Sequence, residues 1–129
     1  MSSSSDRKIW IAETSAVTTV VSGADASSLV RRRLASGFHE TNFECNNAAW
    51  GITVVTNGQR AMVCCTLSDS GEYRHLIDAS ATGESCGYIL SNGQSDCYAN
   101  RDTVELDVAL DELARFIDGE KPRATWQVD

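Results

Sequence analysis

Apolar residues recur at helical spacing in the segment 24–37. Together with one arginine, they share a single face of the expected helix: Leu29, Val30, Arg33 and Leu34. Asp25 or Ser27 can cap the first turn, and Gly37 suits the position just after the last turn. The pattern therefore predicts one amphipathic helix in the first third of the chain.

A second helical pattern precedes the only proline of the chain. Its apolar positions are three or four residues apart: Leu106, Ala109 or Leu110, Leu113 and Ile117. The charged residues fall largely on the other faces: Glu105, Asp107, Asp111, Glu112 and Arg115. We expect this helix to begin between Thr103 and Asp107 and to end at Gly119, because Pro122 cannot continue it.

Two apolar segments, 49–56 and 60–67, flank Asn57-Gly58. Asn-Gly between apolar runs is a strong hairpin signal, because both residues tolerate the positive φ angles of a type I′ turn. Both segments contain consecutive apolar residues, which predicts central strands covered on both faces. Asn92-Gly93, between 86–90 and 95–99, predicts a second hairpin of the same chemistry.

Other segments also have strand character. Those at 8–12 and 72–77 predict two further strands, whereas 16–22 is compatible with a strand or with a lead into the first helix. Segment 124–128 alternates with period two and places Ala124, Trp126 and Val128 on one apolar face. We expect Trp126 to be buried between helix and sheet.

Together these patterns predict one α+β domain over residues 8–129, preceded by a disordered leader at 1–7. It should contain about five to seven strands in total, with a central, mostly antiparallel sheet that has Asn-Gly hairpins and packs against two helices. Small and turn-forming residues at 78–85 predict a loop.

The net charge of −7 is unevenly distributed. Residues 1–64 hold five acids and six bases, whereas residues 65–129 hold thirteen acids and five bases. An acidic surface argues against a nucleic-acid partner and permits a basic protein partner. The alternative is a solvated acidic surface with no partner. The one basic cluster, 31–33, must point around its helix and forms no single stripe.

The five cysteines form no Cys-x-x-Cys pair, so no structural zinc motif is present. Cysteines scattered in apolar segments are typical of small core residues in a reducing compartment, which predicts a cytoplasmic protein. A secretory signal that begins at Arg7 is the alternative, although Glu13 interrupts its apolar part. No apolar run is long enough to cross a membrane, so no membrane partner is expected.

No catalytic or cofactor motif is evident. His75 could pair with Cys64 or Cys86 as a nucleophilic site, but no flanking signature supports this. Cysteine and histidine combinations that could bind a metal, such as Cys45 with His39, lack the spacing of zinc ligands. Scattered acids offer no distinctive catalytic pair. We therefore expect no catalytic residue, metal or cofactor.

The C-terminal third resembles the Imm1 family of bacterial immunity proteins. The resemblance rests on a hairpin at Asn92-Gly93, an amphipathic helix, a short turn and a strand with a tryptophan near its end. The matching residues are Phe116, Gly119, Pro122 and Trp126. The 49–67 hairpin also resembles the central sheet of the family, so the likeness covers about residues 42–129.

The resemblance implies a non-enzymatic inhibitor of a cognate toxin, often of the deaminase class. Contact residues vary within such families, so we predict them from the acidic loop and strand surface: Asp69, Glu72, Tyr73, Asp78, Glu84 and Asp96. Two alternatives remain at this point. One is a regulatory or secretion-adaptor subunit, and the other is a small enzyme that uses cysteine and histidine.

Overall fold

A computed structural model describes the chain except for residues 1–9, 14–17, 21, 46–49 and 68–69. The predicted leader and Asp69 lie outside the described residues. The elements in chain order are β1 (Trp10–Glu13), β2 (Thr18–Val20), α1 (Gly23–Ala35), β3 (Glu40–Cys45), β4 (Trp50–Thr56), β5 (Arg60–Leu67), β6 (Glu72–Ile77), β7 (Glu84–Ile89), β8 (Ser95–Ala99), the short 3₁₀ helix η2 (Asn100–Asp102), β9 (Val104–Glu105), α2 (Leu106–Asp118) and β10 (Thr125–Val128).

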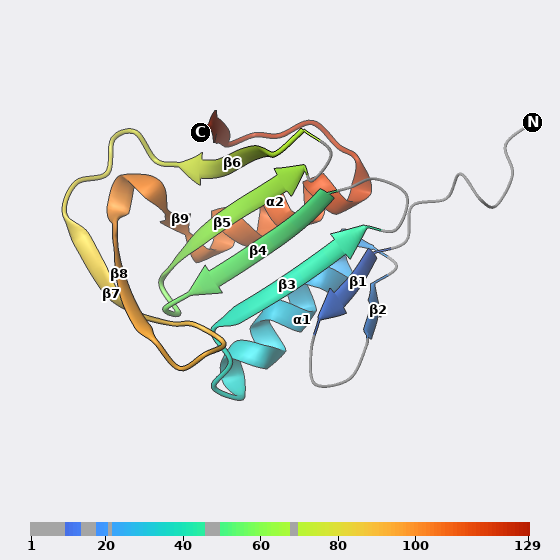
Figure 1. The fold of residues 1–129 in the computed structure, drawn as a ribbon, viewed down its shortest axis with the longest axis horizontal. Helices are drawn as coiled ribbons and strands as arrows, with labels where there is room; N and C mark the ends of the chain where they lie inside the picture. Colours follow the sequence, from blue (N-terminus) through green and yellow to red (C-terminus); the bar gives the residue numbers. More distant parts are fainter. Residues whose placement is uncertain (1–9, 14–17, 21, 46–49, 68–69) are drawn as a thin grey trace, which may run out of the picture.

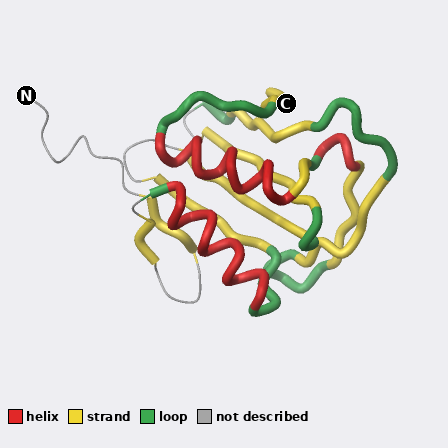
Figure 2. The backbone as a smooth tube through the Cα atoms, turned by 180° about the vertical axis from the view of Figure 1, so that it is seen from behind, coloured by secondary structure: helices red, strands yellow, loops and turns green. Residues whose placement is uncertain are grey.

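The main sheet is antiparallel and is covered on one face by two helices (Figures 1 and 2). Its strand order is β10-β6-β5-β4-β3-β1-β2, and β9 adds to the free part of β5. Strands β7 and β8 form a separate hairpin, here named the arm. The predicted α+β class is confirmed, although the described residues alone hold ten strands rather than five to seven.

Helix α1 begins one residue after Ser22, whose Oγ accepts the Asp25 backbone N–H at 3.2 Å. The predicted caps, Asp25 and Ser27, are therefore wrong, because both lie inside the first turns. Gly23 packs so closely on α2 that a methyl group there would come within 2.3 Å of the Ala114 carbonyl oxygen. The helix ends as expected, with Gly37 at φ 90°.

Helix α2 matches its predicted pattern closely. Leu106, Ala109, Leu110 and Leu113 are buried against the sheet, and Gly119 ends the helix in the left-handed conformation at φ 74°. Glu112 is the exception, because it is 1% exposed where the pattern placed it on a solvated face. Neither helix of the described chain is long and apolar enough to span a membrane.

Both Asn-Gly hairpins form, at 57–58 and 92–93. Gly58 has φ 96°, but no residue other than glycine has positive φ in the described chain, so the turn is not the predicted type I′. Instead, Asn57 Oδ1 accepts the backbone N–H groups of Gln59 and Arg60 at 2.9 and 2.8 Å. This side chain to backbone turn is a common alternative use of asparagine.

Strand β10 follows Pro122, forms within the segment where the period-two pattern predicts a strand, and pairs with β6. Trp126 is half-buried and its ring centroid lies 5.8 Å from that of Phe116. Trp10 and Trp50 also contact Phe116, so all three tryptophans surround one phenylalanine. Val128, expected on the buried apolar face, is 60% exposed, because β10 lies at the outer edge of the sheet.

Candidate functional site

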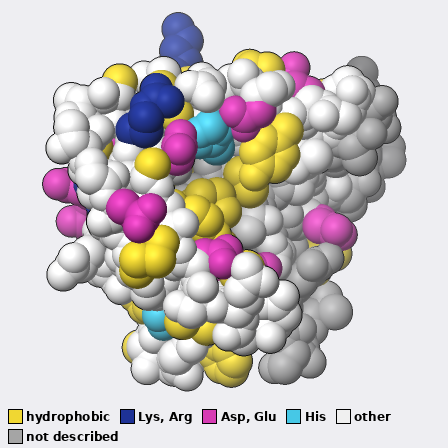
Figure 3. Space-filling model, turned by 60° about the vertical axis from the view of Figure 1, so that its left-hand side comes forward, with side chains coloured by type: hydrophobic (Ala, Val, Ile, Leu, Met, Phe, Trp, Pro, Cys, Tyr) yellow, Lys and Arg dark blue, Asp and Glu magenta, His cyan; other side chains and the backbone are white. Residues whose placement is uncertain are grey.

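The sheet face opposite the helices carries most of the polar side chains discussed below. In each of the strands β3 to β6, successive side chains point to opposite faces of the sheet. One alternate set packs under the helices, and the other set points to this second face. We name it the open face and define it by its side chains: Glu40, Asn42, Thr53, Cys64, Tyr73 and His75, joined by Asp96 and Tyr98 of the arm. Figure 3 shows acidic groups around exposed apolar and aromatic side chains, with a histidine between two acids.

The arm lies across one end of the sheet (Figure 1). Tyr88 of β7 is fully buried, and so is Val55 of β4, although neither belongs to the core under the helices. Two polar contacts join the arm to neighbouring turns: Asn57 Nδ2 donates to the Cys86 carbonyl at 3.1 Å, and His39 Nδ1 lies 3.1 Å from the Gly87 carbonyl. The consecutive apolar residues of β4 and β5 are thus covered on both faces near the arm, as predicted.

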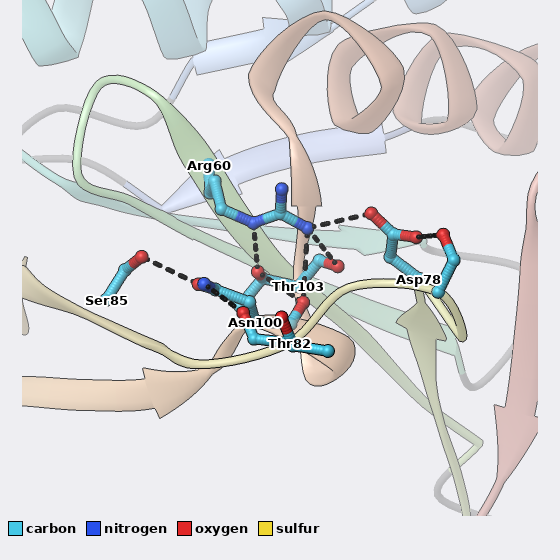
Figure 4. A network of polar contacts seen from close by, with 7 residues as sticks. Arg60, Asp78, Thr82, Ser85, Asn100 and Thr103 are labelled. Atoms are coloured by element: carbon cyan, nitrogen blue, oxygen red, sulfur yellow. Dashed lines mark hydrogen bonds and ion pairs between the residues drawn. The ribbon is translucent and has the colours of Figure 1, made fainter.

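Arg60 fixes the base of the arm (Figure 4). Its Nε donates to Thr103 Oγ1 at 2.8 Å, and its Nη2 lies 3.0 Å from Asp78 Oδ2 and 3.1 Å from the Asn100 carbonyl. Asn100 in turn accepts the Ser85 hydroxyl at 2.6 Å. The segments that enter and leave the arm are therefore held by one guanidinium group.

A disulfide joins Cys86 and Cys97 across the two strands of the arm. Both residues face outward, whereas Cys45, Cys64 and Cys65 are buried free thiols. The expectation of small core cysteines is therefore correct for three of the five and wrong for the arm pair. The pair escaped prediction because it depends on which strands become neighbours, and one strand carries an irregularity between Ser85 and Tyr88.

Hydrogen bonds run across the open face from one strand to the next. Asn42 Nδ2 donates to Glu40 Oε2 at 2.8 Å, and Thr53 Oγ1 donates to Asn42 Oδ1 at 2.6 Å. Glu40 Oε1 also accepts the Ser91 backbone N–H from the arm at 3.0 Å. Burial raises the pKa of Glu40, but the hydrogen bonds from Asn42 and Ser91 outweigh it and leave the pKa below its usual value, so this carboxylate is charged at neutral pH.

All three tyrosines of the chain gather on this side of the sheet. The rings of Tyr88 and Tyr98 lie 4.7 Å apart, and the Tyr98 hydroxyl donates to Asp96 Oδ2 at 3.2 Å. Tyr73 is 40% exposed. Burial, followed by the contact with Asp96, raises the pKa of Tyr98 to about 12, and burial also raises that of Tyr73. Both phenols are therefore neutral hydrogen-bond donors at physiological pH.

His75 sits between two carboxylates, with Nε2 3.0 Å from Asp102 Oδ1 and Nδ1 2.8 Å from Asp129 Oδ2. Burial lowers the pKa of His75, but the two acids outweigh it and raise the pKa overall. Cys64 lies opposite His75 in the β5–β6 register, yet burial raises the pKa of its thiol. Both ring nitrogens are engaged and the thiol is not activated, so this pair does not make a nucleophilic site.

Two further candidate groups both include Cys86 of the arm. Cys86, the alternative partner of His75, is bonded to Cys97. Among the described residues, the group with metal-ligand spacing is Glu84, Cys86 and Cys97, and two of its three ligands are consumed by the disulfide.

The three arginines of α1 diverge as expected: Arg31 pairs with Asp107 at 2.8 Å, whereas Arg33 Nε donates to Thr41 Oγ1 at 3.0 Å.

The structure brings together only part of the predicted contact set. Tyr73 and Asp96 both lie on the open face, where Asp96 accepts the Tyr98 hydroxyl. Asp78 belongs to the Arg60 network, and the Arg60 hydrogen bond holds its pKa below the usual value. Glu84 is exposed on the outer side of the arm. Glu72 is paired with Arg74 on the helix side.

Sequence reasoning missed Glu40 and Asn42, because it assigned no strand to 40–45, and it missed Thr53, because it singled out no polar residue of the predicted strand 49–56. A usable signal was present: Thr41, Phe43 and Cys45 alternate with polar residues and are all buried. A scan against protein-family models finds no match, and a search of curated proteins finds none either. The likeness to the Imm1 family rests on the residues quoted above for it.

Proposed function

We propose that this protein is an immunity protein that binds and neutralises a cognate toxin of the deaminase class through the open face. The observation that carries the proposal is the gathering of three tyrosines and several carboxylates on one face, with Tyr73 40% exposed. Tyrosine is enriched among the residues that dominate protein interfaces, because its ring is large, rigid and polar at one end.

The charges of the open face support this partner. Glu40, Asp96, Asp102 and Asp129 all lie on or beside it. A deaminase that acts on nucleic acid needs a basic groove, and an acidic surface complements such a groove in both affinity and encounter rate. An inhibitor needs no nucleophile, which agrees with the engaged histidine and the unactivated thiol.

The arm contributes rigidity. It is closed by the Cys86–Cys97 disulfide and anchored by Arg60. A surface that is ordered before binding loses less conformational entropy on association, so more of the contact energy appears as affinity. The proposal places the protein in the cytoplasm of the producing cell, where thiol buffers can reduce an exposed disulfide. The Arg60 network must then hold the arm together with its contacts to Asn57, His39 and Glu40.

The test is co-expression with the toxin domain encoded beside the gene, followed by titration calorimetry of the purified pair. Tyr73→Ala should weaken binding by roughly tenfold to a hundredfold and abolish protection. Val108→Ala is the matched control, because Val108 is 39% exposed but lies on α2, on the other side of the sheet. Both variants should unfold at nearly the wild-type temperature.

Two outcomes would end the proposal in different ways. Failure of the wild-type protein to bind or protect would remove the immunity function itself. If Tyr73→Ala and Val108→Ala bind the toxin equally well, the open face is not the contact surface. Electrostatic complementarity has its own test: the association rate should fall as salt rises, and a flat dependence would exclude steering.

A further inference from the structure

The disulfide of the arm lies at the point where the pairing of its two strands is interrupted (Figure 1). The register of β7 with β8 shifts between Ser85 and Tyr88, so that Cys86 and Gly87 together face the single residue Cys97. Gly87 has the positive φ of 89°. Two residues opposite one is the arrangement of a β-bulge, which disrupts the backbone ladder. The disulfide therefore links the strands where regular backbone pairing does not.

The two ends of the arm are held by bonds of their own. At the base, the Asn100 N–H donates to the Gly83 carbonyl at 2.9 Å. At the tip, the Leu90 N–H donates to the Gln94 carbonyl at 2.8 Å. An isolated two-stranded hairpin is only marginally stable in water, so its middle depends on additional links. Loss of the disulfide should loosen the middle of the arm while its ends stay in place.

The middle of β7 is anchored to the rest of the fold more firmly than the middle of β8. The side chains of Asn57 and His39 contact backbone carbonyl groups of β7, and Tyr88 is fully buried. Strand β8 is tied to β7 at this point by the disulfide and by the contact between the Tyr98 and Tyr88 rings, whose centroids are 4.7 Å apart. Reduction removes the covalent tie, and β8 is the strand that can move.

Cys97 lies between the two residues that the arm contributes to the open face. Successive side chains of a strand point to opposite sides, so Cys97 is exposed on the outside while Asp96 and Tyr98 are half-buried on the inside. Burial is the largest cause of the raised pKa of Tyr98, and the charge of Glu40 adds to it, which places this ring beside the main sheet. A displacement of β8 at Cys97 therefore displaces both open-face residues.

The other three cysteines are poorly placed for thiol–disulfide exchange. Cys86 and Cys97 are exposed, whereas Cys45, Cys64 and Cys65 are buried. Burial raises the pKa of the Cys64 thiol and raises that of Cys65 to about 11. Because the thiolate is the reactive form, these two thiols stay protonated and unreactive at neutral pH. A change of redox conditions should therefore act on the arm pair.

We propose that the arm disulfide is a redox switch that holds Asp96 and Tyr98 on the open face and releases them when it is reduced. A thiolate of a dithiol reductant attacks one sulfur, and the other sulfur leaves as a thiolate and takes up a proton. The second thiol of the reductant then displaces the first sulfur. The disulfide thus gains two electrons and two protons, and the reductant becomes a disulfide.

The consequence for binding rests on the proposed function. If the open face contacts the toxin, release of Asp96 and Tyr98 weakens the complex, because an unordered surface loses more conformational entropy on association. Tyr73 belongs to β6 of the main sheet and stays in place. The switch therefore tunes the affinity for the toxin and does not abolish protection.

Release is tested by NMR on the wild-type protein before and after treatment with dithiothreitol. We expect nuclear Overhauser contacts between the rings of Tyr88 and Tyr98 in the oxidised protein and their loss after reduction. Amide shifts should change in the middle of the arm and stay unchanged at the buried Leu113 of α2. The double variant Cys86→Ser with Cys97→Ser is the matched control. It should resemble the reduced wild type and should not respond to dithiothreitol.

Binding is tested by titration calorimetry with the toxin domain. Reduction should weaken the wild-type complex about tenfold. The double variant should bind like the reduced wild type, with or without dithiothreitol, which also shows that the reductant leaves the toxin intact.

Unchanged ring contacts after complete reduction, verified by the mass of the alkylated protein, would overturn the switch. A response of the double variant to dithiothreitol would also overturn it, and so would equal toxin affinity of the oxidised and reduced wild type. Failure of the oxidised protein to bind the toxin at all would instead remove the proposed function. The NMR comparison would then still decide whether reduction releases Tyr98.

Discussion

Removal of the buried Glu112 carboxylate should unfold the connection between α2 and β10. Glu112 is 1% exposed, and its Oε1 accepts the backbone N–H groups of Arg123 and Ala124 at 2.6 and 2.5 Å. No other acceptor within the described chain bonds to these two donors. In Glu112→Ala, both donors lose their partner at a part-buried site.

The magnitude follows from the two orphaned donors. Each buried N–H without an acceptor costs about 1–3 kcal/mol, so Glu112→Ala should lower the free energy of unfolding by about 4 kcal/mol. For a chain of this length that corresponds to a fall of roughly 12–20 °C in Tm. Glu112→Gln keeps a carbonyl oxygen for both donors and loses only the charge, which should cost about 1–2 kcal/mol.

The assay is urea denaturation followed by circular dichroism and tryptophan fluorescence. Asp111→Ala is the neighbouring control, because Asp111 is exposed and its helical pair with Arg115 contributes only about 0.3–0.5 kcal/mol. A loss below about 1 kcal/mol in Glu112→Ala would refute the reasoning. So would equal losses in the Ala and Gln variants, since the loss would then come from charge rather than from missing acceptors.

Three further predictions concern the arm, the histidine and the last strand. Replacing both Cys86 and Cys97 by serine should lower the free energy of unfolding by up to about 3 kcal/mol, as expected for a closed loop with a sequence separation of 11; no change in urea denaturation would contradict this. The pKa of His75 is raised, because its two acids outweigh burial, so its stabilisation is complete below the unfolded pKa of about 6.5 and is lost as pH rises through the folded pKa. His75→Gln should therefore be most destabilising near pH 5.5–6, and a difference that grows toward pH 9 in thermal unfolding scans would show the wrong sign. Trp126→Ala should cost about 2–3 kcal/mol, less than a fully buried tryptophan, and an unchanged Tm would show that its contact with Phe116 contributes nothing.

Local patterns were sufficient for much of the fold. Both helices, the two Asn-Gly hairpins and the final strand depend on interactions within a few residues, so periodicity and turn chemistry predict them. Strand β3 was missed, although it alternates throughout, because only two of its six residues are apolar. Glu112 was assigned to the solvated face because its burial depends on the loop that folds back over it, which no helical pattern records.

The candidate site was less predictable for a related reason. A sequence shows which residues share one face of a strand but not which strands become neighbours. Tyr73 and Tyr98 are 25 positions apart, and only the arm's path across the sheet brings them together. The same path creates the Cys86–Cys97 pair.

The predicted acidic residues differ in whether their side chains pair with an arginine of the same fold. Asp78 forms an ion pair with Arg60, and Glu72 forms one with Arg74. Both carboxylate charges are therefore neutralised within the fold. Asp96 instead accepts neutral donors, the Tyr98 hydroxyl and the Gln94 amide, and pairs with no cation in the described part of the chain. Hydrogen bonds to neutral groups orient a carboxylate without cancelling its charge. Among the described acids of that set, Asp96 is therefore the one whose charge the fold orients through neutral donors, and under the proposed function it is the acid we expect to meet a basic partner.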